Sequence, residues 1–460
     1  MVVLDLLVVA TALSTIRTDL HASMGELEWT VNSYTLTFAV FLMTAAAIGD
    51  RFGRRRTFAV GLGVFAIGSA ACALAPSAGW LIAARAVQGV GAAMVMPLAL
   101  ALLNAAIPAE RRGWALGIFG AATALSAVVG PVVGGAVTQG IAWQWIFWLN
   151  VPIALIVLPL ALSRLSESYG PRAALDLPGL TLGIGAALGL VWGLIRGSTA
   201  GWASPEVAGT LAAGAAATIA FTWWESRAAA PMLPMRLFRV RGFAAGNTAI
   251  FLFNGSLTGA IFFTAQFLQV GLQQGALAAG LRLLPLGAVP LLVAPWSGRL
   301  ADRLGERPLV ASGLLLQGAG LAWMAVIARP ALAYLGMLVP MLIAGLGITL
   351  AVPAATRAVV GSVPVLDIGK ASGAFTTMRQ LGGAFGVAVL AAVFGAAGSY
   401  AAPDAFSRGF APAMAVAAGL ALAGAAAGLA LPHRPAPAPR PQLLDAASKA
   451  SQEPAGSVRS

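Results

Sequence analysis

Long apolar runs separated by short polar turns make up almost the whole chain. A helix needs roughly 20 apolar residues to cross a bilayer, and fourteen runs approach or exceed that length. They are continuously apolar with interspersed Gly and Pro, which is typical of membrane helices and not of the alternating strands of a barrel. The predicted spans are 2–16, 30–49, 57–75, 80–103, 115–138, 144–162, 177–195, 207–224, 243–268, 281–300, 308–327, 333–356, 373–397 and 410–431.

The first run is short for a membrane span. Val2 to Ile16 is 15 residues, which is roughly 22 Å of helix against a hydrocarbon core of roughly 30 Å. Either the true start of the chain lies upstream of Met1, or the first helix is short.

Composition supports a membrane protein and excludes several other classes. Of the 460 residues, 59% are hydrophobic and only 10% are charged, whereas a soluble domain averages about 25% charged residues. The single Cys72 excludes a disulfide within the chain, and the two histidines stand at opposite ends, so no metal-ligand cluster is expected. We find no nucleophile–base pair and no phosphate-binding loop, so we expect neither an enzyme nor a cofactor.

Basic residues alternate with the predicted spans, which indicates how the chain is oriented. The turns after even-numbered spans, with the tail, hold 21 Lys and Arg, and the turns after odd-numbered spans hold 5. By the positive-inside rule both termini are then cytoplasmic. The net charge of +12 is therefore read as orientation charge and not as a nucleic-acid footprint.

Two copies of a basic turn divide the chain into related halves. Asp50-Arg51-Phe52-Gly53-Arg54-Arg55 returns 252 positions later as Asp302-Arg303-Leu304-Gly305-Glu306-Arg307, each after the second span of its half. The predicted organisation is a six-helix bundle at 1–163, an inserted hairpin at 164–226, a cytoplasmic linker at 227–242, a second six-helix bundle at 243–431 and a disordered tail at 432–460.

A few charged side chains lie inside the predicted spans, where each is costly unless it is paired or hydrated. Asp5 is the only acid plainly embedded in a span, and Arg85 and Arg379 are the embedded bases. Asp5 is thus the leading candidate for a proton carrier, although at the membrane edge it would simply be solvated. Glu26 and Glu28 at the start of the second span are either a proton entry or a solvated surface.

These motifs resemble the major facilitator superfamily, and in particular its fourteen-span drug:proton antiporters of the QacA/EmrB type. The resemblance rests on the two basic turns, on Arg85-x-x-Gln88-Gly89-x-Gly91, on Gly130-Pro131-Val-Val-Gly134-Gly135 with Gly117 upstream, and on Leu4-Asp5 in the first span. It departs from the family pattern at Ala46, Ser126, Leu7, Ala10 and Ser14.

The resemblance implies a role for each set of residues. Proton coupling is assigned to Asp5, Arg85, Arg379, Glu26 and Glu28, and gating to Asp50, Arg51, Gly53, Arg54, Arg55, Asp302, Arg303 and Gly305. The antiporter helix motif is Gly117, Gly130, Pro131, Gly134 and Gly135. A substrate route is assigned to polar residues of the spans, although Asn and Gln there also just bond neighbouring helices: Asn32, Tyr34, Gln88, Asn247, Asn254, Gln266 and Gln269.

The resemblance further implies an all-α polytopic protein with the major facilitator fold, two six-helix bundles and an inserted pair of helices. The implied function is export of lipophilic drugs or antibiotics across the inner (plasma) membrane, with protons as the other transported species and the proton gradient in place of a cofactor. The protein is expected to lie in membrane lipid and to have no nucleic-acid partner. It is expected to function as a monomer. A dedicated exporter of one self-made metabolite, such as an antibiotic or siderophore, is the nearest alternative, and a non-transporting membrane sensor is a remote one.

Overall fold

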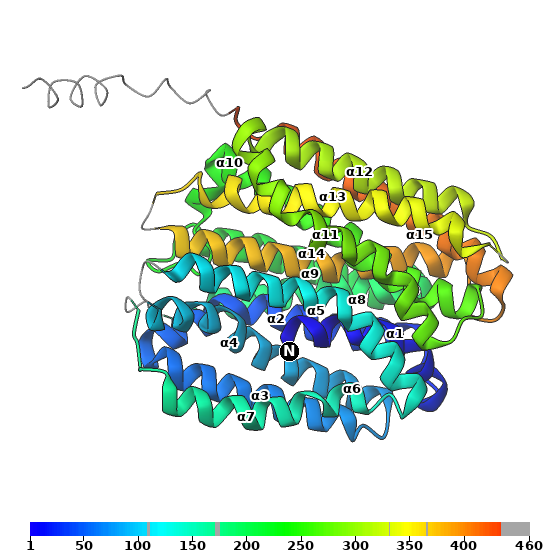
Figure 1. Ribbon diagram of the computed structural model, residues 1–460, viewed down its shortest axis with the longest axis horizontal. Coiled ribbons are helices and arrows are strands. Elements are labelled where there is room, and N and C mark those ends of the chain that lie inside the picture. The colour runs from blue at the N-terminus through cyan, green and yellow to red at the C-terminus, as the bar shows by residue number, and fades with distance from the viewer. Residues whose placement is uncertain (108–110, 171–174, 331, 365–366, 434–460) are drawn as a thin grey trace, which may run out of the picture.

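The computed structural model of the chain is a bundle of long helices (Figure 1). It describes residues 1–460 except 108–110, 171–174, 331, 365–366 and 434–460. The helices are α1 (Val2–Asp19), α2 (Met24–Phe52), α3 (Arg54–Ala73), α4 (Ala78–Ala106), α5 (Arg112–Gly140), α6 (Trp145–Trp148), α7 (Asn150–Arg164), α8 (Leu177–Ala200), α9 (Pro205–Glu225), η2 (Met235–Arg239), α10 (Arg241–Gln266), η3 (Phe267–Gly271), α11 (Ala276–Leu304), α12 (Glu306–Ile327), α13 (Tyr334–Val360), α14 (Ile368–Ala397) and α15 (Pro403–Leu429).

Every predicted span falls on a helix of the structure. The span at 144–162 is divided between the one-turn α6 and α7, and α1 runs three residues beyond the predicted end at Ile16. Among the residues that the structure describes, twelve helices are long and apolar enough to cross a membrane. Because α1 and α5 are not among these twelve, the count of fourteen crossings stays a prediction.

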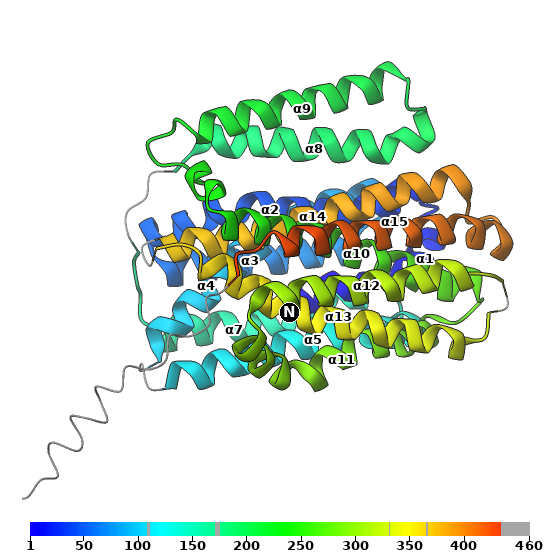
Figure 2. The same cartoon turned by 90° about the horizontal axis from the view of Figure 1, so that it is seen from above.

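Contacts between elements group the helices into two bundles with a hairpin beside them. α1–α7 pack with one another, as do α10–α15, and the bundles meet where α5 lies against α11 and α2 lies against α14. Figure 2 shows α8 and α9 side by side as a layer outside both bundles, with α8 next to α2 and α14. The two long halves are therefore joined by their second and fifth helices.

Glycines allow these helices to approach closely. A side chain at Gly134 in α5 would meet the backbone of Val8 in α1, and one at Gly135 would meet the backbone of Ala276 in α11. Pro131 presents its carbonyl oxygen to Gly280 of α11 in the same way. The glycine-rich stretch of α5 thus packs against both halves of the molecule, as small residues do at membrane helix contacts.

Candidate functional site: a buried charged network in the first half

Asp5 of α1 lies inside the first bundle and not at an exposed edge. Its side chain is 1% exposed, so the solvated alternative is wrong for this structure. Its carboxylate accepts hydrogen bonds from Arg85 (2.5 Å), Gln88 (2.9 Å) and Asn150 (2.8 Å). Three side chains from two helices, Arg85 and Gln88 of α4 and Asn150 of α7, thus direct donors at a single carboxylate.

Arg85 of α4 is the positive partner, and it is fully buried (0% exposed). Its Nη1 donates to Asp5 and to Gln88 (2.7 Å), and its Nε donates to the carbonyl oxygen of Thr30 (3.1 Å). The guanidinium also stacks 4.2 Å from the ring centre of Tyr34. Its Nη2 has no hydrogen-bond partner among the described residues.

Gln88 joins the ion pair to further polar groups. One turn of helix after Arg85, its Nε2 donates to Ser69 of α3 (2.6 Å) as well as to Asp5. Asn150 donates to the same hydroxyl of Ser69 (3.2 Å). The set of Asp5, Ser69, Arg85, Gln88 and Asn150 is called the Asp5 network below. Sequence reasoning did not assign Ser69 and Asn150 a role, because an isolated Ser or Asn in a span gives no sign of what it faces.

The network has a clear electrostatic consequence. A buried ion pair is tolerated when its members are hydrogen-bonded to each other and to further donors. Loss of the charge of Asp5 would leave Arg85 buried without its carboxylate, at a cost of several kcal/mol. Binding of a proton at Asp5 therefore favours any other arrangement of α1 and α4 in which Arg85 is hydrated or paired elsewhere.

The other residues assigned to proton coupling lie apart from this network. Glu26 forms a capping box with Ser23 at the start of α2, accepting from its backbone N (2.8 Å) and its Oγ (2.7 Å). Glu28 is 3% exposed, so the solvated-surface interpretation is wrong for Glu28. Arg379 lies in α14 with its Nε buried and without a hydrogen-bond partner among the described residues.

The first basic turn is held by a segment that sequence reasoning did not single out. The carboxylate of Glu167, after α7, accepts from the backbone N of Arg55 (2.8 Å) and of Arg56 (3.3 Å), which caps the start of α3. Asp50, near the end of α2, forms an ion pair with Arg54, the first residue of α3 (2.8 Å).

The remaining gating residues are exposed or conformationally special. Arg51 and Arg303 are exposed. Gly53 and Gly305 have φ of 110° and 82°, which is the region that favours glycine. The side chain of Asp302 and the surroundings of Gly117 lie outside what the structure describes.

The residues assigned to the substrate route fall into two groups. Some bond the protein: Tyr34 donates to Val2 (3.2 Å), Asn247 to Phe243 (2.9 Å), Asn254 to Arg379 (2.7 Å) and Gln269 to Thr11 (3.1 Å), with a further bond between Gln269 and Ser14. Gln88 belongs to the Asp5 network. Asn32 and Gln266 differ, because both are buried and both amide atoms of each lack a partner among the described residues.

The whole of this arrangement lies within a stretch that matches a known family. Residues 1–387 match the model of the Major Facilitator Superfamily. The chain belongs to the major facilitator superfamily. Members of the superfamily are transporters, and this chain is accordingly a multi-pass membrane protein.

Several relatives within the superfamily are named for resistance or export. The chain is 36% identical over 395 residues to the tetracenomycin C resistance and export protein of Streptomyces glaucescens, covering 85% of this chain and 73% of that protein. It is 38% identical over 408 residues to the cephamycin export protein CmcT of Amycolatopsis lactamdurans, covering 86% and 82%. It is 35% identical over 398 residues to the multidrug resistance protein Stp of Mycobacterium tuberculosis, covering 86% and 74%.

Solved structures agree on the fold. A peptide transporter POT in complex with sulfate superposes with a TM-score of 0.68 at 16% identity, covering 94% of this chain and 93% of that one. The xylose transporter XylE from E. coli superposes with a TM-score of 0.59 at 15% identity, covering 91% and 94%. At such identities the likeness shows the major facilitator fold alone.

Proposed function

We propose that this protein exports lipophilic drugs or antibiotics across the inner (plasma) membrane in exchange for protons, by alternating access. The Asp5 network carries the proposal, because it is a buried ion pair whose stability depends on one protonatable group. The relatives named for resistance and export support the direction of transport and the substrate class. The protein then acts as a transporter and not as an enzyme, with the proton gradient in place of a cofactor.

The coupling step follows from the geometry of the network. With Asp5 charged, Arg85 and Gln88 hold α1 and α4 together. A proton on Asp5 removes the charge that Arg85 neutralises, and the free-energy difference between the two facings of the transporter changes by the cost of that unpaired base. A ligand shifts the same equilibrium only through its different affinity for the two facings.

The substrate route lies between the halves in this proposal. Asn32 and Gln266 contact the transported compound, because their amides are buried without partners and a ligand with donors and acceptors would satisfy them. The basic turns at Asp50 and Asp302 face the cytoplasm, as do both termini. The bundles at 1–163 and 243–431 move against each other, and the protein works as a monomer in lipid.

Drug-driven proton movement tests the function. Inside-out vesicles that contain the protein and a pre-formed proton gradient receive cationic and neutral lipophilic drugs while the internal pH is followed. We expect drug-dependent proton release in the wild type and its loss in Asp5→Asn. Glu206→Gln is the matched control, because Glu206 is an exposed acid of α9, outside both bundles, and has no assigned role in proton coupling.

A dedicated metabolite exporter is the second candidate, and the likeness to a cephamycin export protein favours it. It shares the fold and the coupling, so the breadth of substrates separates the two. Release with many unrelated drugs supports the drug exporter, whereas release with one compound class alone supports the dedicated exporter. Absence of release with every compound, from correctly folded protein, contradicts both.

A further inference from the structure

The two halves are built alike around their first four helices. Residues of α1, α2 and α3 correspond to residues of α10, α11 and α12 that lie 252 positions later, which is also the distance between the two basic turns. Residues of α4 correspond to residues of α13 that lie 256 positions later. Close glycine contacts repeat under these shifts. Gly89 lies against the backbone of Tyr34, and its counterpart Gly345 lies against the backbone of Leu286. Gly91 lies against the backbone of Gly61, and its counterpart Gly347 lies against the backbone of Gly313.

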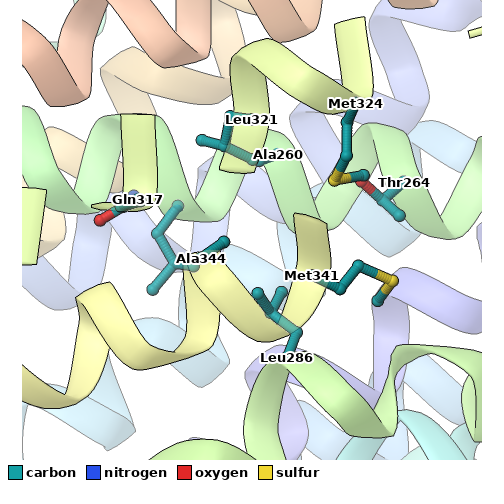
Figure 3. Close-up of a pocket in the computed structure, with 9 residues that line it drawn as sticks. Ala260, Thr264, Leu286, Gln317, Leu321, Met324, Met341 and Ala344 are labelled. Atoms are coloured by element: carbon teal, nitrogen blue, oxygen red, sulfur yellow. The ribbon is translucent and has the colours of Figure 1, made fainter. Parts of the chain in front are cut away.

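The counterpart of the Asp5 network in the second half is apolar. Under the same shifts the network residues Asp5, Ser69, Arg85 and Gln88 correspond to Leu257, Leu321, Met341 and Ala344. Tyr34 and Cys72, which contact Arg85 and Gln88, correspond to Leu286 and Met324. All six counterparts line one internal pocket between α10, α11, α12 and α13 (Figure 3). The position that holds a charged cluster in one half is thus an apolar pocket in the other.

One polar group in this pocket lacks a partner. Gln317 of α12 is 0% exposed, and its Nε2 donates to the hydroxyl of Ser256 (3.0 Å). Its carboxamide oxygen has no hydrogen-bond partner among the described residues. An unsatisfied acceptor in apolar surroundings costs about 1–3 kcal/mol, so a group that donates to it is bound favourably.

The wall of the pocket can adapt to an occupant. Met324 and Met341 line it (Figure 3), and methionine side chains rearrange at low cost around different apolar shapes. Leu257 is the lining residue that is only partly buried, so the pocket lies closest to an accessible surface at α10.

We propose that this pocket holds an apolar group of the exported compound, such as one aromatic ring, and that the carboxamide oxygen of Gln317 accepts a hydrogen bond from a hydroxyl or amine on it. The inference rests on the proposed export function. The pocket as it stands has a volume of only about 10 Å³, so Met324 and Met341 must move before one ring or branched alkyl group can enter. The first half then carries the proton, and the second half adds an apolar site for part of the cargo.

Photolabelling tests whether such a group enters. The probe is a trifluoromethyl-phenyldiazirine with a para-hydroxymethyl group, compared with its methyl ether, which has no donor. Purified protein in lipid nanodiscs is illuminated with each probe, and labelled residues are mapped by mass spectrometry. We expect labelling of Met324 or Met341 by the alcohol. Val326 and Leu335, which are 85% and 75% exposed on α12 and α13, report labelling from the lipid.

Two variants test whether labelling depends on the Gln317 acceptor and on the space in the pocket. Gln317→Met removes the acceptor at similar size, so we expect about tenfold less pocket labelling by the alcohol and no change with the methyl ether. Ala344→Leu fills the pocket, so labelling by both probes should fall. Unchanged labelling of Val326 and Leu335 and an unchanged thermal unfolding midpoint show that a variant is folded.

The outcomes separate this inference from the proposed function, because drug-driven proton release is measured on the same protein. Labelling confined to Val326 and Leu335, with proton release intact, overturns the pocket and leaves the function standing. Pocket labelling that is equal for the alcohol and the ether, or unchanged in Gln317→Met, overturns the role of Gln317. Pocket labelling without drug-driven proton release overturns the export function, and with it the assignment of the pocket to cargo.

Discussion

At the scale of single residues, the strongest electrostatic feature is the pair of Asp5 and Arg85. Both side chains are buried, and the side-chain amides of Gln88 and Asn150 also donate hydrogen bonds to the Asp5 carboxylate. A buried pair of this kind adds little net stability by itself, but removal of one partner alone leaves an uncompensated charge. The two residues should therefore be strongly coupled.

A double-mutant cycle measures this coupling. We expect Arg85→Gln to lower the free energy of unfolding by about 3 kcal/mol, and addition of Asp5→Asn to recover most of that loss. Denaturant unfolding of the purified protein in detergent gives both values. Arg196→Gln serves as a control, because its partner Glu206 is exposed and little change is expected. Losses that simply add would contradict the coupling.

The sequence predicted the members of this site better than their arrangement. Asp5 and Arg85 were recognisable because charges inside apolar runs are rare. Their pairing depends on how α1 packs on α4, which no local pattern encodes. Ser69, Asn150 and Gln317 were assigned no role, because no local pattern shows that the first two face Asp5 or that an oxygen of the third lacks a partner. The choice between the two alternatives for Glu28 could not be made from the sequence for the same reason, since its burial depends on helices far away in the sequence.

At the scale of elements, glycines determine which helices touch. A side chain at Gly386 of α14 would overlap the backbone of Gly255 in α10, whereas one at Gly419 of α15 meets no atom within 4 Å. We expect Gly386→Ala to abolish accumulation of folded protein. Gly419→Ala should raise stability slightly, because Ala favours a helix by about 1 kcal/mol over Gly. Fluorescence-detected gel filtration compares the two, and equal behaviour would contradict this packing.

A second prediction at this scale concerns the cap on α3. Glu167→Ala removes the acceptor for the backbone N of Arg55 and Arg56, and loss of a cap costs about 1 kcal/mol. We expect a lower thermal unfolding midpoint, with partial recovery in Glu167→Gln, which keeps one acceptor oxygen. Identical midpoints for the two variants would show that the charge of Glu167, and not its hydrogen bonds, matters at this turn.

For the whole molecule, the apolar runs predicted every long helix, and the repeated turn predicted two related halves. The helices could be predicted because bilayer thickness sets the length of a span. The two halves could be predicted because the same turn recurs 252 positions later in the sequence. The packing of α5 on α11 and of α2 on α14, and the place of the α8–α9 hairpin, could not be read. They depend on contacts between residues that are hundreds of positions apart, such as Gly135 and Ala276.

Three hydrogen bonds between the halves lie at the end opposite the basic turns. Gln269 after α10 bonds the carbonyl oxygen of Thr11 (3.1 Å) and the hydroxyl of Ser14, both in α1. Gln139 at the end of α5 accepts from the backbone N of Leu277 (3.0 Å) at the start of α11. These contacts hold the halves together at this end, so a transporter that alternates must break them once in every cycle.

Loss of one of these contacts should shift the balance between the two facings. We expect Gln269→Leu to lengthen the mean distance between spin labels at Thr18 and Gln273, which are exposed at this end in opposite halves. Asn247→Leu is the control, because Asn247 bonds Phe243 within its own helix. Pulsed electron resonance in lipid measures both. A distance distribution that Gln269→Leu leaves unchanged would mean that the apolar contacts of α1 and α10 are enough to keep this end closed, and that opening is set by the Asp5 network alone.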